Sequence, residues 1–229
     1  MATNTLFVSE SQQDTLFAME SQRSIEYPRS LTEEFRPLKI ADFVGLPKIK
    51  AVLSNLVKAP RNCSLLFQGS PGTGKSTMAL AFSKELNADL WHLGSADCRI
   101  EKLQETISRC YYIPRAGLNG FHVILVDEIE TASPASINFL LSKMDATEPI
   151  PNTILIFTCN DSSTLSERFV SRTLKLDFNS YGASSEIISL LEHVWEQKAG
   201  GKPQPNFRKI AVGNVHESLN RLEVALLEC

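Results

Sequence analysis

The fold of this chain is decided by residues 64–77, which read Ser-Leu-Leu-Phe-Gln-Gly-Ser-Pro-Gly-Thr-Gly-Lys-Ser-Thr. Residues 64–68 are mainly apolar and have the length of a strand, whereas residues 77–86 place apolar side chains at helical spacing. Between them lies a glycine-rich loop with the pattern Gly69-x-x-x-x-Gly74-Lys75-Ser76. A strand, this loop and a helix in that order are typical of a P-loop, which holds the phosphates of a nucleotide.

The chemistry of this loop explains why the pattern suits phosphates. Glycines let successive backbone N–H groups turn inward, and the helix N-terminus adds a partial positive charge. We expect Lys75 to reach the β- and γ-phosphates and the Ser76 hydroxyl to ligate Mg²⁺. The alternative is a glycine-rich turn that binds nothing, but the complete pattern in its structural context favours a nucleoside triphosphate bound with Mg²⁺. The predicted phosphate site comprises Gly69, Ser70, Pro71, Gly72, Thr73, Gly74, Lys75, Ser76 and Thr77.

A second informative stretch is residues 121–130, Phe-His-Val-Ile-Leu-Val-Asp-Glu-Ile-Glu. Its apolar run is typical of a parallel strand buried on both faces. Asp127 and Glu128 follow at the carboxyl end, where open α/β sheets bind their ligands. We predict that Asp127 holds Mg²⁺ through water, and that Glu128 orients or deprotonates the attacking water. The alternative is a solvated acidic loop after a core strand.

Composition places the chain among ordinary globular proteins. It has 229 residues, of which 43% are hydrophobic and 21% charged, and its net charge of −3 offers no general attraction for nucleic acid. No apolar run approaches the roughly 20 residues that cross a bilayer, and the first residues lack the features of a signal or transit peptide. The five cysteines are scattered without a Cys-x-x-Cys pair, and His92, His122 and His193 show no metal-ligand spacing, so we interpret these residues as structural and expect a cytoplasmic protein.

The first 30 residues are polar, with serine, glutamine, threonine and glutamate prominent. This composition predicts a flexible tail. The alternative is that the apolar segments 6–8 and 16–19 dock on a partner.

Residues 31–45, Leu-Thr-Glu-Glu-Phe-Arg-Pro-Leu-Lys-Ile-Ala-Asp-Phe-Val-Gly, precede the P-loop. In that position they resemble the "Tyr-Arg-Pro … Val-Gly" segment of AAA+ clamp-loader ATPases, the branch of the replication factor C small subunits. In that family the segment lies over the adenine. The resemblance therefore implies a base pocket made of Arg36, Pro37, Phe43, Val44 and Gly45.

Two further sites follow from the same resemblance. Residues 152–160 form an apolar run ending in Asn160, which by itself is a common turn former but is similar to the AAA+ sensor 1 residue near the γ-phosphate. Residues 171–173, Ser-Arg-Thr, resemble the family's Ser-Arg-Cys box. This implies that Arg172 is an arginine finger for a neighbouring subunit's nucleotide. Arg168 is the competing candidate, and a surface salt bridge is the alternative for either residue.

The chain beyond residue 178 is helical throughout, with predicted helices at 183–198, 206–212 and 214–227. This region resembles the small lid of AAA+ proteins. Residues 213–220 are similar to the sensor 2 run Gly-Asp-Met-Arg-x-x-Leu-Asn, with His216 in the arginine position, so His216 becomes a candidate nucleotide contact.

The predicted architecture is a P-loop α/β domain with a parallel five-stranded sheet, followed by a three-helix lid. We divide the chain into a tail (1–30), an AAA+ ATPase domain (31–178) and a lid (179–229). The resemblance covers residues 31–227, and clamp-loader subunits continue from there into a collar domain that we expect this chain to lack.

The function that the resemblance implies is an ATP-hydrolysing switch in DNA replication or repair, loading or remodelling a protein on DNA. It implies a homo- or hetero-oligomer of AAA+ subunits, in which hydrolysis is completed by a neighbour. Any DNA contact would rest on a few cations, namely Arg99, Lys102, Arg115 and Lys143. The alternative is a nucleotide-stabilised scaffold or adaptor with little hydrolysis, which His216 and Gly94 favour because the family has arginine and asparagine there.

Overall fold

The computed structural model of the protein describes residues 29–94, 97–113, 120–145, 149–179 and 184–228. The predicted tail lies almost wholly outside these residues. Residues from Leu31 onward form one compact unit. No helix within the described ranges is long and apolar enough to span a membrane.

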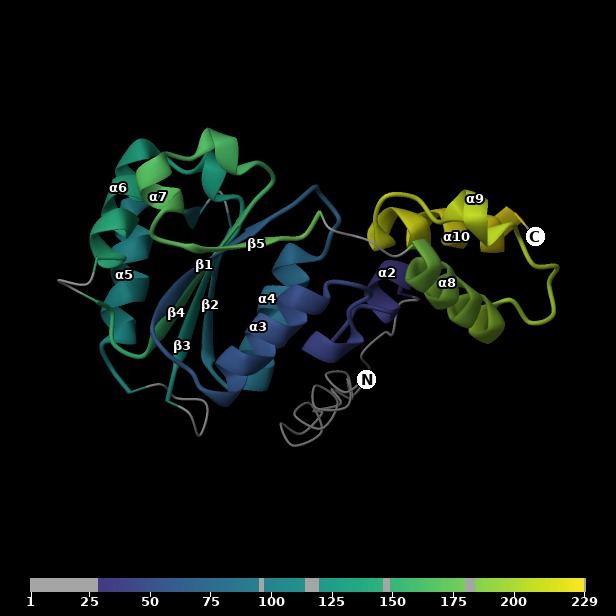
Figure 1. Ribbon diagram of the computed structural model, residues 1–229, viewed down its shortest axis with the longest axis horizontal. Helices are drawn as coiled ribbons and strands as arrows, with labels where there is room; N and C mark the ends of the chain where they lie inside the picture. The colour runs from purple at the N-terminus through teal and green to yellow at the C-terminus, as the bar shows by residue number, and fades with distance from the viewer. Residues whose placement is uncertain (1–28, 95–96, 114–119, 146–148, 180–183, 229) are drawn as a thin grey trace, which may run out of the picture. The chain divides into compact units, whose positions relative to one another are not determined.

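A five-stranded sheet forms the centre of the α/β part (Figure 1), and every pairing in it is parallel, as the sequence predicts. Its strand order is β2-β3-β4-β1-β5. The crossovers between parallel strands carry the helices, as parallel pairing requires. The strands are β1 (Cys63–Gln68), β2 (Asp89–Leu93), β3 (His122–Val126), β4 (Thr153–Cys159) and β5 (Leu174–Asp177).

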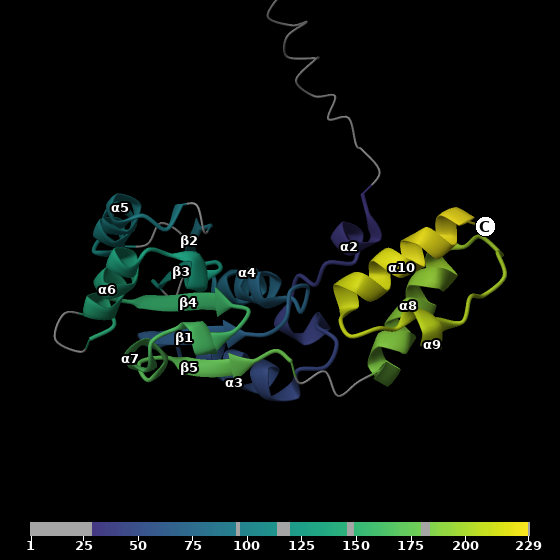
Figure 2. The same cartoon turned by 90° about the horizontal axis from the view of Figure 1, so that it is seen from above.

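Both faces of the sheet are buried, because successive strand residues point to opposite sides and are apolar on both. Helices α3 (Pro47–Lys58) and α4 (Lys75–Leu86) pack on one face, where Leu65 and Phe67 of β1 point. Helices α5 (Ile100–Cys110) and α6 (Pro134–Lys143) cover the other face, where Leu66 points. Figure 2 shows this layering from above. Short elements complete this part, namely α2 (Leu31–Glu34), η1 (Ile40–Asp42), η3 (Ile129–Thr131), η4 (Ser162–Thr164) and α7 (Glu167–Val170).

Helix α6 begins at Pro134, behind the turn η3 that follows the acidic pair. Ser133 sets this start, because its side chain accepts the backbone N–H of Ser136 and proline suits the first helical turn. Helix α5 ends at Cys110.

The C-terminal region contains the three predicted helices, α8 (Ser184–Lys198), α9 (Phe207–Ile210) and α10 (Val215–Glu228). They enclose their own apolar core, which includes the fully buried Leu191, Val194 and Leu222. Leu31 of α2 is buried in the same cluster, so the start of the segment before the P-loop packs against the lid helices. The domain boundaries given above stay predictions.

Candidate nucleotide-binding site

The carboxyl ends of β1, β3 and β4 meet at one edge of the sheet, because all three strands are parallel neighbours. The P-loop continues directly from β1 into α4. Strand β4 lies between β1 and β3, which puts Asn160 between the P-loop and the acidic residues. This is the arrangement expected of a sensor 1 residue.

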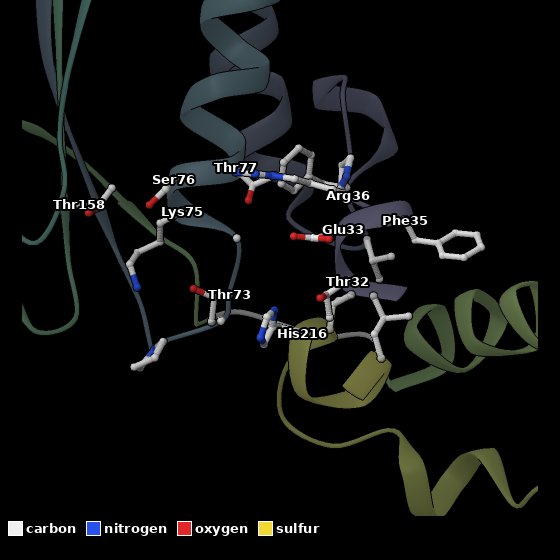
Figure 3. A pocket seen from close by; sticks show the side chains of 18 of the residues that line it. Thr32, Glu33, Phe35, Arg36, Thr73, Lys75, Ser76, Thr77, Thr158 and His216 are labelled. Atoms are coloured by element: carbon white, nitrogen blue, oxygen red, sulfur yellow. The ribbon is translucent and has the colours of Figure 1, made fainter. Parts of the chain in front are cut away.

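A cavity of about 480 Å³ lies at this edge. Figure 3 shows Lys75, Ser76 and Thr158 at one end and Glu33, Phe35 and Arg36 across from them. Most of the predicted site residues line it, namely Arg36, Pro37, Phe43, Val44, Pro71, Gly72, Thr73, Gly74, Lys75, Ser76, Thr77, Glu128, Asn160 and His216. The lining omits five predicted residues, which are Gly45, Gly69, Ser70, Asp127 and Arg172.

Close packing at one position and positive φ angles at two others require glycine in this loop. A Cβ atom on Gly69 would lie 2.8 Å from Cβ of Phe178 and 3.1 Å from Oγ1 of Thr73. Gly72 has a φ of +76° and Gly74 one of +87°, values that side-chain-bearing residues rarely adopt. The curled loop therefore depends on glycine at these positions.

We expect Gly69→Ala to lower the free energy of unfolding by roughly 1–3 kcal/mol, because the new methyl group overlaps the Phe178 side chain. Gly94→Ala is the matched control, since a Cβ atom there meets nothing within 4 Å. Its free energy of unfolding should change by at most about 0.5 kcal/mol. Urea denaturation of the two variants measures both values. Equal stability of Gly69→Ala and the parent would contradict the packing described here.

Lys75 is held by oxygens of its own loop. Its Nζ donates to the backbone carbonyls of Gly69 (2.6 Å) and Ser70 (3.0 Å) and to Oδ1 of Asn160 (3.1 Å). Burial lowers the pKa of the Lys75 ammonium, while nearby acidic groups, among them Glu130, act in the opposite direction. The ammonium therefore stands at the phosphate end of the cavity beside the predicted sensor residue.

Asp127 is the centre of a hydrogen-bond network across three strands. Its Oδ1 accepts from Oγ of Ser76 (2.6 Å) and Oγ1 of Thr158 (2.9 Å). Its Oδ2 lies 2.5 Å from Nε2 of His92, at the end of β2. Thr158 in turn accepts the backbone N–H of Glu128 at 3.0 Å. A hydroxyl and a carboxylate side by side are the hard oxygen donors that Mg²⁺ prefers.

His92 and Thr158 are parts of this network that the sequence interpretation missed. His92 is the penultimate residue of β2, and the β2–β3 register brings it beside the end of β3. Thr158 lies two residues before Asn160 and so points to the same side of β4. Both are polar residues near the carboxyl end of a strand, and this position is the signal that could have indicated them.

Glu128 has a φ of +53°, a left-handed conformation that is uncommon for a residue with a side chain. Such backbone strain collects at functional sites, where the surrounding structure maintains it. The side chain is exposed and lines the cavity. A carboxylate in this position can accept a proton from a water molecule at the phosphate end.

The predicted base end of the cavity is lined by residues of the segment before the P-loop and of the lid. Cε1 of Phe43 would lie 3.4 Å from a Cβ on Gly74, and Cβ of His216 would lie 3.3 Å from a Cβ on Gly72. Gly45 is not among the residues that line the cavity, and its N–H donates to Oε2 of Glu186 in α8 (2.6 Å). Asn214 caps the start of α10, because its side chain accepts the N–H of Glu217 at 2.8 Å.

Arg172 lies away from this cavity, beside a second one of about 620 Å³ that Arg61 and Lys143 also line. Its Nη1 donates to the carbonyl of Arg168 (3.1 Å), and its Nη2 is 3.5 Å from Oδ2 of Asp145. Arg172 is therefore not among the residues that line the cavity at the chain's own P-loop.

A parallel sheet, a glycine loop opening a helix, and an acidic pair at the adjacent strand end define a P-loop nucleotide-binding protein. Residues 65–180 match the family model described as "ATPase family associated with various cellular activities (AAA)". The chain belongs to this AAA family.

Curated relatives include the replication factor C small subunit 2 of Pyrobaculum islandicum, which is 27% identical over 84% of this chain and 62% of its own length. The replication factor C small subunit of Methanococcus maripaludis is 28% identical over 84% of this chain and 63% of its own length. The chain thus spans less than two thirds of the length of these relatives. Their names confirm the predicted resemblance to the clamp-loader branch.

Among solved structures, the Thermotoga maritima RuvB Holliday junction branch migration motor superimposes with a TM-score of 0.65. The match covers 85% of this chain and 68% of that one at 18% identity. This likeness concerns the fold alone, and it supports the predicted architecture.

Proposed function

We propose that the protein is an AAA+ switch that binds ATP with Mg²⁺ and hydrolyses it, in the manner of clamp-loader subunits. One observation carries the proposal: Lys75, Ser76, Glu128 and Asn160, from three neighbouring strand ends, line one cavity, and Lys75 donates to Asn160 there. A protein that used the fold only as a scaffold would have no need to bring a base and a γ-phosphate sensor together there.

Residues with the right chemistry for Mg²⁺ stand beside the phosphate end. Ser76 and Asp127 would hold the ion, with the remaining positions filled by phosphate oxygens and water. No group of three or more histidine, cysteine or acidic side chains that could hold a metal occurs among the described residues. A site with only one or two protein ligands suits Mg²⁺, because this ion usually keeps several water ligands and takes others from the phosphates of the substrate. The bound ion would neutralise charge on the phosphates.

The chain's own residues have separate parts in the proposed reaction. Lys75 would exchange its loop carbonyls for phosphate oxygens and remain beside Asn160. Glu128 would orient the attacking water and take its proton. Phe43, Val44, Arg36 and Pro37 would surround the base, and His216 would contact the nucleotide from the lid.

We further propose that the active site is completed by a neighbouring AAA+ subunit, in a homo- or hetero-oligomer. Support comes from Arg172, which lines a different cavity from its own P-loop. The relatives' names make DNA replication the proposed setting, with DNA and a DNA-mounted protein as partners. Of the candidate DNA-contacting cations, Lys102 pairs with Glu105 at 3.0 Å, and Arg115 lies outside the described residues.

The proposal is tested by the ATPase rate at increasing protein concentration. Hydrolysis that needs two subunits should rise faster than linearly with concentration until assembly is complete. A variant that cannot bind nucleotide, Lys75→Ala, provides the background rate. A rate indistinguishable from that background at every concentration, despite bound ATP, would instead support the nucleotide-stabilised scaffold.

A further inference from the structure

Glu130 is an acidic residue of the site to which the proposed mechanism gives no part. It belongs to the turn η3, directly after Asp127 and Glu128. Its Oε1 accepts the backbone N–H of Asn160 at 2.8 Å. Its Oε2 is buried and has no hydrogen-bond partner among the described residues. A buried acceptor without a partner is costly, and in a native structure it calls for an explanation.

The position of Asn160 explains why this hydrogen bond matters. The ladder between β3 and β4 ends with the pair Val126 and Phe157. Asn160 lies three residues beyond Phe157, so no residue of β3 can take its N–H. The Glu130 carboxylate instead accepts this N–H, and so holds the backbone at Asn160 beyond the end of the sheet.

The turn η3, which contains Glu130, is fixed by a buried side chain and by two hydrogen bonds. Ile129 is fully buried in the core beneath it. The backbone N–H and the hydroxyl of Thr131 both donate to the carbonyl of Glu128, at 2.9 and 2.8 Å. The Glu130 side chain therefore starts from a fixed backbone, and its carboxylate can serve as a rigid support.

We propose that Glu130 is a positioning residue for ATP hydrolysis, holding Asn160 so that its amide oxygen stays on Lys75 and faces the nucleotide cavity. This inference rests on the ATPase function proposed above. The geometry forms one chain of contacts, from Glu130 through the Asn160 backbone and its Oδ1 to Nζ of Lys75.

The test compares three substitutions of Glu130. Glu130→Ala removes the acceptor, Glu130→Asp keeps the charge on a side chain one methylene shorter, and Glu130→Gln keeps an acceptor oxygen without the charge. For Glu130→Ala and Glu130→Asp we expect kcat to fall roughly 10- to 100-fold, the effect of losing a charge-assisted hydrogen bond, with KM for ATP changed less than about threefold. Glu130→Gln should keep kcat within about fivefold of the parent. Glu101→Ala, an exposed acidic position on α5, is the control and should match the parent.

A second readout does not depend on turnover. Hydrogen exchange of the Asn160 amide, followed by NMR in the full chain, should be slow in the parent and in Glu130→Gln. It should be at least about tenfold faster in Glu130→Ala and Glu130→Asp, because protection follows the hydrogen bond. An inactive parent would refute the ATPase proposal, while the exchange rates would still test the Glu130 contact.

Two results would overturn the inference. One is a loss of kcat in Glu130→Gln as large as in Glu130→Ala, which would mean that the charge acts and not the hydrogen bond. The other is parental kcat and parental Asn160 exchange in Glu130→Asp. If Glu130→Ala fails to show a cooperative melting transition, Glu130→Asp and Glu130→Gln decide the question between them.

Discussion

Arg172→Ala should leave ATP binding intact and abolish the concentration-dependent part of ATP hydrolysis. Arginine fingers supply roughly 10³–10⁵ in rate where they act, because they stabilise charge that develops in the transition state. In this chain the Arg172 guanidinium lies beside Asp145 and a cavity separate from the P-loop. If Arg172 is a finger, we therefore expect it to act on a nucleotide that another subunit holds.

Mixing two inactive variants makes this test decisive. Lys75→Ala retains its Arg172 but cannot hold ATP, whereas Arg172→Ala holds ATP and lacks the guanidinium. A mixture of the two should regain activity. Arg168→Ala is the matched control one helical turn away, and it should behave like the parent. If the mixture stays inactive while native gels show that the variants co-assemble, Arg172 is not a finger.

Glu128→Gln should separate nucleotide binding from chemistry. The substitution keeps the size of the side chain but removes the base, so ATP should bind as in the parent while turnover falls by roughly 10²–10⁴-fold. The left-handed backbone at Glu128, and its N–H bond to Thr158, are unaffected by the change from carboxylate to amide. Single-turnover hydrolysis and equilibrium ATP binding measure the two quantities.

The control for Glu128→Gln is Glu101→Gln, which makes the same chemical change at an exposed position of α5. It should leave turnover unchanged. Parental turnover in Glu128→Gln would mean that another group activates the water, and the role proposed for Glu128 would have to be abandoned.

The fold could be predicted because its signals are local. Apolar runs such as residues 121–126 identify buried parallel strands, and glycines at fixed spacing identify the loop between β1 and α4. The parallel arrangement follows once strands alternate with helices, since such crossovers need room for a helix. The site residues at strand ends, Asp127 and Asn160, could be located for the same reason.

The hydrogen bonds that surround Asp127 and Asn160 could not be predicted, because they depend on the order and register of the strands. Nothing in the sequence near His92 indicates that β2 will pair with β3 and bring its imidazole to Asp127. Glu130 likewise meets Asn160 only because β3 and β4 are neighbours. Gly45, assigned to the base pocket by resemblance, donates its N–H to Glu186, a contact between segments far apart in the chain.

Binding of ATP in the cavity at the P-loop can be measured by titrating the protein with a fluorescent ATP analogue in the presence of Mg²⁺. The parent and Lys84→Ala, which alters an exposed lysine on the same helix α4, should bind the analogue equally well. Lys75→Ala should show no saturable binding, because Lys75 supplies the ammonium at the phosphate end of the cavity. Equal affinity of Lys75→Ala and the parent would contradict the account.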